Sequence, residues 1–167
     1  MSLFNVPMVP RDGTITITDG SAQVLTVQYE EGDFQAESFR ASHHATEVIY
    51  DRDVPYAVRE TKKEPINFSF SAHATDFADA VERTIPNMVM GTGFFAAGSN
   101  STMGANYPVR TLKIVFTVEQ TNYGAGADSV LTLNHCRVDV GFTEGVPGKF
   151  TIKGIAIPFA DSDVAFT

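Results

Sequence analysis

The residues of this chain whose types could do chemistry are its histidines, its one cysteine and a few charged turns. His43 and His44 are adjacent, and neighbouring residues of a strand point to opposite faces, so this pair is poorly placed to ligate one metal ion. His135 and Cys136 offer a nitrogen and a sulfur, but no second cysteine or suitably spaced histidine completes a zinc site. We therefore interpret the first pair as loop histidines and the second pair as strand residues, with Cys136 as a buried thiol.

Motifs of the common enzyme classes are missing from the sequence. It contains no Gly-x-Ser-x-Gly elbow, no phosphate-binding Gly-x-x-x-x-Gly-Lys-Ser/Thr loop and no His-Glu-x-x-His zinc motif. The segment 91–96 begins like a dinucleotide-binding loop, but it follows an expected helix, whereas that motif needs a strand before it and a helix after it. The segment 51–53, Asp-Arg-Asp, could hold a cation, although a charged turn is the simpler interpretation. We expect a protein that is not an enzyme and that uses no cofactor and no metal.

Composition and charge narrow the function classes further. The 167 residues are 43% hydrophobic and 19% charged, which is enough to bury a core, and we expect one domain over residues 1–167. A net charge of -8 argues against a protein that grips nucleic acid, because neutralising phosphates requires clustered Lys and Arg. We find neither a run of about 20 apolar residues nor the basic and apolar regions of a secretory signal. We therefore expect no membrane contact and folding in a cytoplasm.

Alternating apolar and polar residues predict antiparallel strands along most of the chain. Asp19-Gly20 and Arg52-Asp53 supply turns for two hairpins. A shift in the phase of alternation predicts a bulge near Asn134-His135, and we expect a second shift at Gly154. The expected strands are Thr14–Thr18, Val24–Glu30, a weak strand over Phe34–Arg40, Thr46–Asp51, Val54–Glu60, Ile66–Ala72, Arg110–Gln120, Ser129–Gly141 and Lys149–Ala160.

One helix is expected, over about residues 75–85. Phe77, Val81 and Ile85 recur every fourth residue, which would give the helix one apolar stripe. Thr75 or Asp76 offers an N-cap oxygen, and we expect Pro86 to end the helix. The predicted fold class is therefore mainly β, a sandwich or barrel of antiparallel strands with this α-helix packed on its flank.

Two segments are expected to lie outside the regular elements. Residues 1–13 form an apolar, proline-broken arm, and residues 91–108 form a long loop rich in Gly, Ala, Ser and Asn that carries Phe94 and Phe95. A loop of that length inside a compact domain is usually functional or is ordered by a partner. We interpret both segments as contact surfaces between subunits, with packing inside the chain as the alternative. A protein without an active site but with such surfaces is typical of a self-assembling structural subunit.

The order of these elements resembles that of the major tail tube proteins of long-tailed, siphovirus-like bacteriophages. The resemblance covers most of the chain but contains no single specific motif. Two departures are the segment 98–106, which is longer and less polar than expected for that family, and the lack of an appended immunoglobulin-like module after Thr167. The segments that carry the resemblance are 12–17, 25–34, 51–59, 65–71, 76–80, 113–119, 131–136 and 142–147.

The resemblance implies a β-sandwich whose inner sheet joins those of neighbouring copies in a hexameric ring. Stacked rings would form the tail tube, located in the virion after synthesis in the host cytoplasm, through which DNA is ejected. An acidic lumen would repel phosphates, so that DNA passes without specific binding. The implied partners are other copies of the chain together with tape measure, tail terminator and distal tail proteins.

Residues can be assigned to these implied surfaces. The expected contacts between subunits are Leu3, Phe4, Val6, Phe34, His43, His44, Phe94 and Phe95. The expected lumen-facing side chains are Gln28, Glu30, Glu37 and Glu119.

Other function classes share the same patterning. A capsid decoration protein, a tail-completion protein or a tube subunit of a contractile secretion machine would combine a sandwich with one helix. A ligand- or carbohydrate-binding β-sandwich would use the long loop as its pocket, with Tyr107 and Tyr123 nearby, although the sequence contains no Trp. Stoichiometry in a particle separates the structural candidates, and glycan binding identifies the last one.

Overall fold

The computed structural model describes residues 13–27, 33–37, 43–73, 83–97, 101–104, 106, 108–118, 127–146 and 148–167. In these residues the protein is mainly β, with antiparallel strands and one α-helix, as predicted. The strands are β1 (Gly13–Thr18), β2 (Val24–Val27), β3 (Gln35–Ala36), β4 (His44–Asp51), β5 (Val54–Lys63), β6 (Ile66–His73), β7 (Leu112–Val118), β8 (Ser129–Thr143), β9 (Lys149–Ala156) and β10 (Val164–Phe166). The helices are α1 (Ile85–Met90) and the short 3₁₀ turns η2 (Gly93–Phe95) and η4 (Asp161–Asp163).

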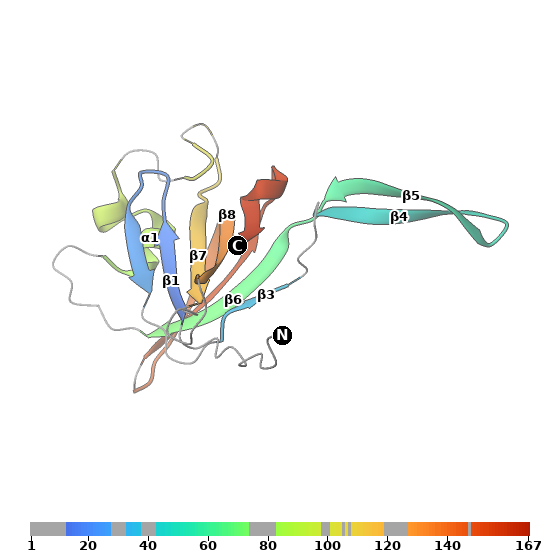
Figure 1. Cartoon of the computed structure of the whole chain (residues 1–167). Coiled ribbons are helices and arrows are strands. Elements are labelled where there is room, and N and C mark those ends of the chain that lie inside the picture. The colour runs from blue at the N-terminus through green and yellow to red at the C-terminus, as the bar shows by residue number, and fades with distance from the viewer. Residues whose placement is uncertain are drawn as a thin grey trace.

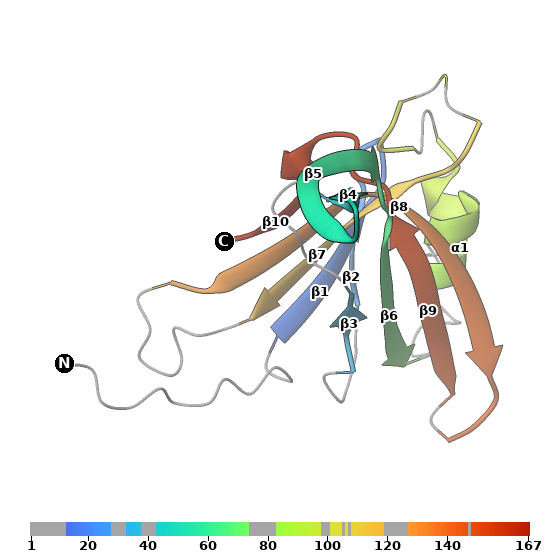
Figure 2. The same ribbon diagram turned by 90° about the vertical axis from the view of Figure 1, so that its right-hand side faces the viewer.

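The strands form one large sheet and one separate hairpin. The large sheet has the order β2-β1-β7-β8-β9-β6-β3, and β10 pairs with β8 beside this path. β4 and β5 pair only with each other, as the predicted hairpin, and project from the body as a long two-stranded arm (Figure 1). Seen along its length, the arm twists strongly, as an unsupported ribbon does (Figure 2).

The large sheet curls so that its two ends face each other across one core. Phe34, which precedes β3, stacks on Phe116 of β7 with ring centroids 4.8 Å apart and lies 5.9 Å from Phe70 of β6. Alternate side chains of β6 and β7 are buried, as their patterns predicted. The core therefore fills the inside of the curl, which is the sandwich or barrel arrangement that the sequence indicated.

β8 is the longest strand and carries the predicted bulge. Leu112 of β7 lies opposite Cys136, whereas Ile114 lies opposite Leu133, so β8 contains one extra residue between these pairs. His135 adopts a left-handed φ of 53° at this point. The bulge turns β8 from its pairing with β7 and β10 to its pairing with β9.

The expected phase shift at Gly154 is wrong. β9 pairs with β6 and β8 without a break from Lys149 to Ala156. Gly154 faces the core, and a Cβ at this position would come within 2.5 Å of the Phe68 ring and 2.3 Å of the Arg137 carbonyl oxygen. The glycine therefore makes room for an aromatic ring and does not mark a bulge.

Only the last residues of the predicted helix fall within the described part of the chain. Most of the predicted range falls on residues 74–82, outside the described part of the chain, and the described helix α1 begins at Ile85. Pro86 does not end a helix but lies in the first turn of α1, where the missing N–H would have no partner anyway. Thr84 caps the start by accepting from the Asn87 N–H at 3.3 Å, and Gly91 ends the helix with a φ of 68°.

Candidate assembly surfaces

The β4–β5 hairpin is the most exposed element of the described chain. Val48 lies opposite Val58, and Ile49 opposite Ala57, with a register shift between Ile49 and Tyr50. Arg52 and Asp53 both have positive φ, 48° and 67°, as the two central residues of a type I′ hairpin turn require. The segment 51–53 is therefore a charged turn at the tip of the arm, as expected.

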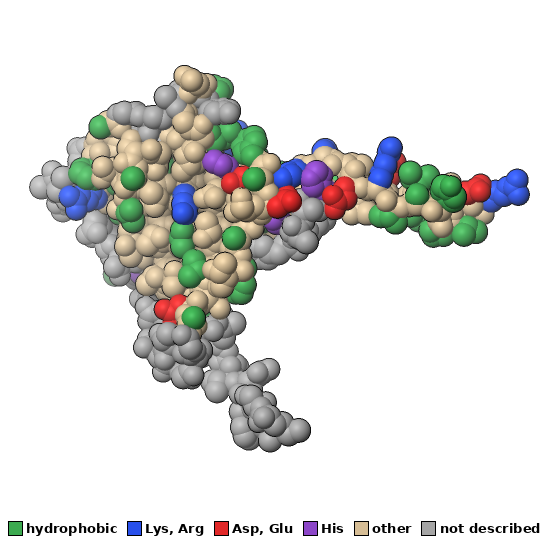
Figure 3. Space-filling view, turned by 45° about the horizontal axis from the view of Figure 1, so that its top comes forward, with side chains coloured by type: hydrophobic (Ala, Val, Ile, Leu, Met, Phe, Trp, Pro, Cys, Tyr) green, Lys and Arg blue, Asp and Glu red, His purple; other side chains and the backbone are tan. Residues whose placement is uncertain are grey.

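Exposed apolar side chains are spread along this hairpin, whose strands pair with no other strand of the described residues. Tyr56 is 79% exposed and Val58 is 66% exposed. Figure 3 shows hydrophobic side chains along the outer part of the arm. A lone two-stranded hairpin is marginally stable in water, and exposed apolar side chains gathered in one place usually mark a contact with a partner. The exposed apolar side chains of the hairpin are Val48, Ile49, Tyr50, Val54, Tyr56 and Val58.

The ionic interaction within the arm does not replace such a contact. Glu47 and Arg59 lie opposite each other and form an ion pair at 2.6 Å, with both side chains largely exposed. Exposed ion pairs contribute at most about 1 kcal/mol. The stability of the arm therefore depends on the backbone pairing of β4 with β5 and on a contact that covers its apolar side chains.

The two histidines predicted as contacts lie at the root of the arm. His43 is only 4% exposed, so little of its side chain is open to a second subunit in the single chain. His44 is half-buried, and its Nδ1–H donates to the Thr61 carbonyl oxygen at 2.5 Å, because a carbonyl can only accept. Both histidines therefore help to hold the root of the arm, and their contact with a second subunit stays a prediction.

The three predicted phenylalanine contacts pack inside the chain. Phe95 is 1% exposed and belongs to the core, which favours the alternative of packing inside the chain over a contact between subunits. Phe34 and Phe94 are half-buried and also pack against the core. The Arg83 guanidinium lies over the Phe94 ring at 4.6 Å, which covers that ring further.

The remaining predicted contact and lumen residues divide between two groups. Leu3, Phe4, Val6, Gln28, Glu30 and Glu119 lie outside the described residues. Glu37 is described and exposed, directly after β3.

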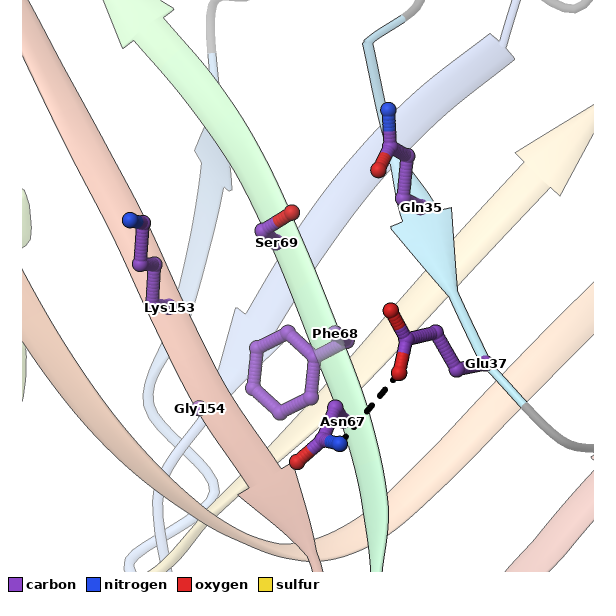
Figure 4. A pocket seen from close by; sticks show the side chains of 7 residues that line it. All are labelled: Gln35, Glu37, Asn67, Phe68, Ser69, Lys153 and Gly154. Atoms are coloured by element: carbon purple, nitrogen blue, oxygen red, sulfur yellow. Dashed lines mark hydrogen bonds between the residues drawn. The ribbon is translucent and has the colours of Figure 1, made fainter.

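Glu37 borders a polar face formed by β3, β6, β9 and β8. Its Oε2 accepts a hydrogen bond from Asn67 Nδ2 at 3.3 Å, and Lys153 lies across the same hollow (Figure 4). Lys153 also lies opposite Asp139 of β8, so positive and negative side chains alternate on this face. The position of Glu37 in a lumen stays a prediction. The described residues around it include both a positive side chain, Lys153, and a negative one, Asp139. The hollow is lined by Gln35, Glu37, Asn67, Phe68, Ser69, Lys153 and Gly154.

A series of polar side-chain contacts, which the sequence did not indicate, links the long loop to β8 and η4. Thr102 Oγ1 lies 2.8 Å from Thr111 Oγ1 and 3.3 Å from His135 Nδ1, and His135 Nε2 lies 3.5 Å from Asp163 Oδ1. The order hydroxyl, imidazole, carboxylate resembles a catalytic triad, but the Thr102 hydroxyl is already bonded to Thr111 and the carboxylate is distant. We interpret these contacts as a fastening between the long loop, the β8 bulge and η4.

Cys136 is buried beside this bulge, as expected. Burial raises the pKa of its thiol, with a hydrogen bond from the backbone of Ile114 acting in the opposite direction. Such a thiol is a poor nucleophile. In the described ranges, no group of three or more His, Cys, Asp and Glu side chains is arranged to hold a metal ion.

Comparisons with known proteins assign the chain to no family. The chain matches no protein-family model and no curated protein sequence. Among the helices of the described residues, none is long and apolar enough to cross a membrane.

Proposed function

We propose that this chain is a structural subunit that assembles with copies of itself into stacked hexameric rings, forming the tail tube of a bacteriophage. The observation that carries the proposal is the projecting β4–β5 hairpin, whose apolar side chains have no cover in the single chain. The order of sequence elements supports it independently, through the resemblance to tail tube proteins.

The hairpin has the reach and the chemistry for a contact between copies. β5 has ten residues, which corresponds to about 33 Å of extended strand. Burying one exposed valine or larger apolar side chain is worth about 1.5–3 kcal/mol, so covering several of them would offset the cost of ordering the arm. An arm that docks on a different surface of the next copy gives a head-to-tail contact, which closes into rings or continues into a filament.

The same proposal places the chain in the virion, with tape measure, tail terminator and distal tail proteins as further partners. DNA would pass through the tube without specific binding, consistent with the net charge of -8. The lumen would then have to include acidic side chains in addition to the mixed polar face around Glu37.

The test is negative-stain electron microscopy with light scattering, over a range of protein concentrations. We expect hollow tubes or six-fold rings, and we expect Val58→Ser in the arm to shift their formation to at least about tenfold higher concentration, equivalent to 1.4 kcal/mol. Val24→Ser in the edge strand β2 is the matched control, because Val24 is 58% exposed on the body. A parent chain that stays monomeric at high concentration and binds a glycan array would overturn the proposal in favour of carbohydrate binding.

A further inference from the structure

The root of the β4–β5 hairpin has the features of a hinge. His44 lies opposite Lys63, but Thr46 lies opposite Glu60, so β5 has one extra residue between these pairs. Bulges of this kind bend a two-stranded ribbon. The bonds across the root of the hairpin include those from the Thr61 hydroxyl to the Ala45 carbonyl at 3.0 Å and from the Glu64 N–H to the His43 carbonyl at 2.8 Å.

His43 stands at the point where the arm leaves the body, and its conformation is costly. Its φ is 53°, in the left-handed region that non-glycine residues rarely adopt. Its Nδ1 is buried and has no hydrogen-bond partner among the described residues. Strain and an unpaired polar atom at one residue persist only when the surroundings hold them in place. The direction of the arm must therefore be fixed by contacts beyond the hinge itself.

Lys63 makes the contacts that can fix it. At the last position of β5, its Nζ donates to the Phe159 carbonyl oxygen at 3.1 Å and to Asp161 Oδ1 at 2.8 Å. The Lys63 side chain is 26% exposed, so these bonds are partly shielded from water. The hydrogen bond from Lys63 is also the main cause that lowers the pKa of Asp161, which agrees with a close charged contact.

The segment that receives Lys63 is itself held to the body. Asp163 Oδ2 accepts from the Ala160 N–H at 2.7 Å, which closes the η4 turn. Asp163 Oδ1 faces His135 on the β8 bulge, and the next residues form β10 on the edge of β8. A bond to η4 is therefore a bond to the rigid part of the molecule.

We propose that Lys63 is the latch of this hinge, meaning that its bonds to Phe159 and Asp161 hold the arm in one direction relative to the body. With its bonds to Phe159 and Asp161 made, the arm keeps the direction seen in Figure 1; with both bonds broken, the arm swings about His43. The latch concerns the single chain, whereas its consequence rests on the proposed function: an arm of fixed direction meets the next copy in one geometry and loses less entropy on docking.

The latch can be measured in the single chain, independently of assembly. Spin labels at Arg52→Cys on the tip and Val24→Cys on β2 report the distribution of distances between arm and body by pulsed electron paramagnetic resonance. Cys136 is fully buried, so it can remain, and the parent chain without the two new cysteines should take up no label. Measurements are made at a concentration at which light scattering gives a monomer.

We expect a narrow distribution for the parent and a distribution at least about twice as wide for Lys63→Met, which keeps the apolar stem. Lys62→Met removes the same charge from the neighbouring exposed lysine and should match the parent. Asp161→Asn leaves the bond to Phe159 and should widen the distribution by less, while circular dichroism shows that each variant is folded. Equal widths for Lys63→Met and Lys62→Met would overturn the latch, whatever the microscopy shows about tubes.

Discussion

Single glycines decide how closely side chains approach the strands of the large sheet. At Gly154 a Cβ would press on the Arg137 carbonyl and the Phe68 ring, whereas at Gly141 the nearest atom is the Thr151 carbonyl oxygen at 3.8 Å. We expect Gly154→Ala to lower the free energy of unfolding by about 1–3 kcal/mol, because the buried ring must move. Gly141→Ala should be neutral or stabilise by up to about 1 kcal/mol. Urea unfolding measures the free energy of unfolding of both variants. Equal values for Gly154→Ala and Gly141→Ala would contradict the packing argument.

The Cys136 thiol is expected to be inert in the folded protein. Burial raises its pKa, and its S–H donates to the Leu133 carbonyl at 3.3 Å, so very little thiolate forms near neutral pH. We expect a disulfide reagent to titrate no thiol in the native protein at pH 8 and one thiol after unfolding. Rapid reaction of the native protein would mean that the edge of the core around the bulge opens readily.

The contact between Asp161 and Lys63 is expected to depend on pH. Its pKa lies below the ordinary 3.8, first because of the hydrogen bond from Lys63. The interaction therefore contributes at every pH above that ordinary value and is lost as the pH falls through the lowered one. We expect Lys63→Met to raise the pKa of Asp161 towards 3.8, measured from its carboxyl carbon shift by NMR, and Lys62→Met to leave it nearly unchanged. An unaltered pKa in Lys63→Met would contradict the contact.

At the scale of elements, the tip of the hairpin is under conformational strain that can be removed. Arg52 and Asp53 occupy the left-handed region, which costs most residues about 1–2 kcal/mol, less for Asn and Asp and least for Gly. We expect the double change Arg52→Asn with Asp53→Gly to raise the protection of hairpin amides in hydrogen exchange, and Asp53→Val to lower it. Protection in the body should not change in either variant, since β4 and β5 pair only with each other.

The strands were predictable because one buried face leaves a period of two in the sequence. The β8 bulge was readable for the same reason, since Leu133 and Cys136 fall on opposite phases yet are both buried. Pro86 was misjudged, because proline is tolerated in a first helical turn as well as after a last one. β10 was missed, because three residues show no period and are separated from β9 by the turn around η4.

The candidate surfaces were less predictable. Alternating apolar and polar residues indicate a strand, but they do not show which part of the molecule covers each face of that strand. The pattern of β4 and β5 correctly gave a hairpin, yet nothing in it shows that the hairpin leaves the sheet. Phe95 lies in a Gly-rich segment, where an aromatic side chain is expected to be exposed. In the structure it belongs to the η2 turn and is buried in the core. Lys63 lies beyond the expected strand Val54–Glu60, and only the fold brings its side chain to Asp161, nearly 100 residues later in the chain.

At the scale of the whole molecule, the arm and the body are expected to be separable in stability but not in function. Thr46 and Glu60 lie opposite each other near the root, so residues 47–59 can be replaced by a two-residue Asn-Gly turn. Because the body keeps its own core, we expect its melting temperature to change by no more than about 4 °C. The trimmed chain should form no tubes or rings at any concentration at which the parent does.

Calorimetry and electron microscopy of the trimmed chain separate the two parts of this expectation. A folded, strictly monomeric trimmed chain would mean that the body supplies stability and the arm supplies the contact between copies. Tubes formed without the arm would remove the observation that carries the proposed function and direct attention to the free edge of β2. A trimmed chain that unfolds would instead contradict the expected separation and show that β4 and β5 stabilise the body, because Lys63 and its bonds to Phe159 and Asp161 remain in this variant.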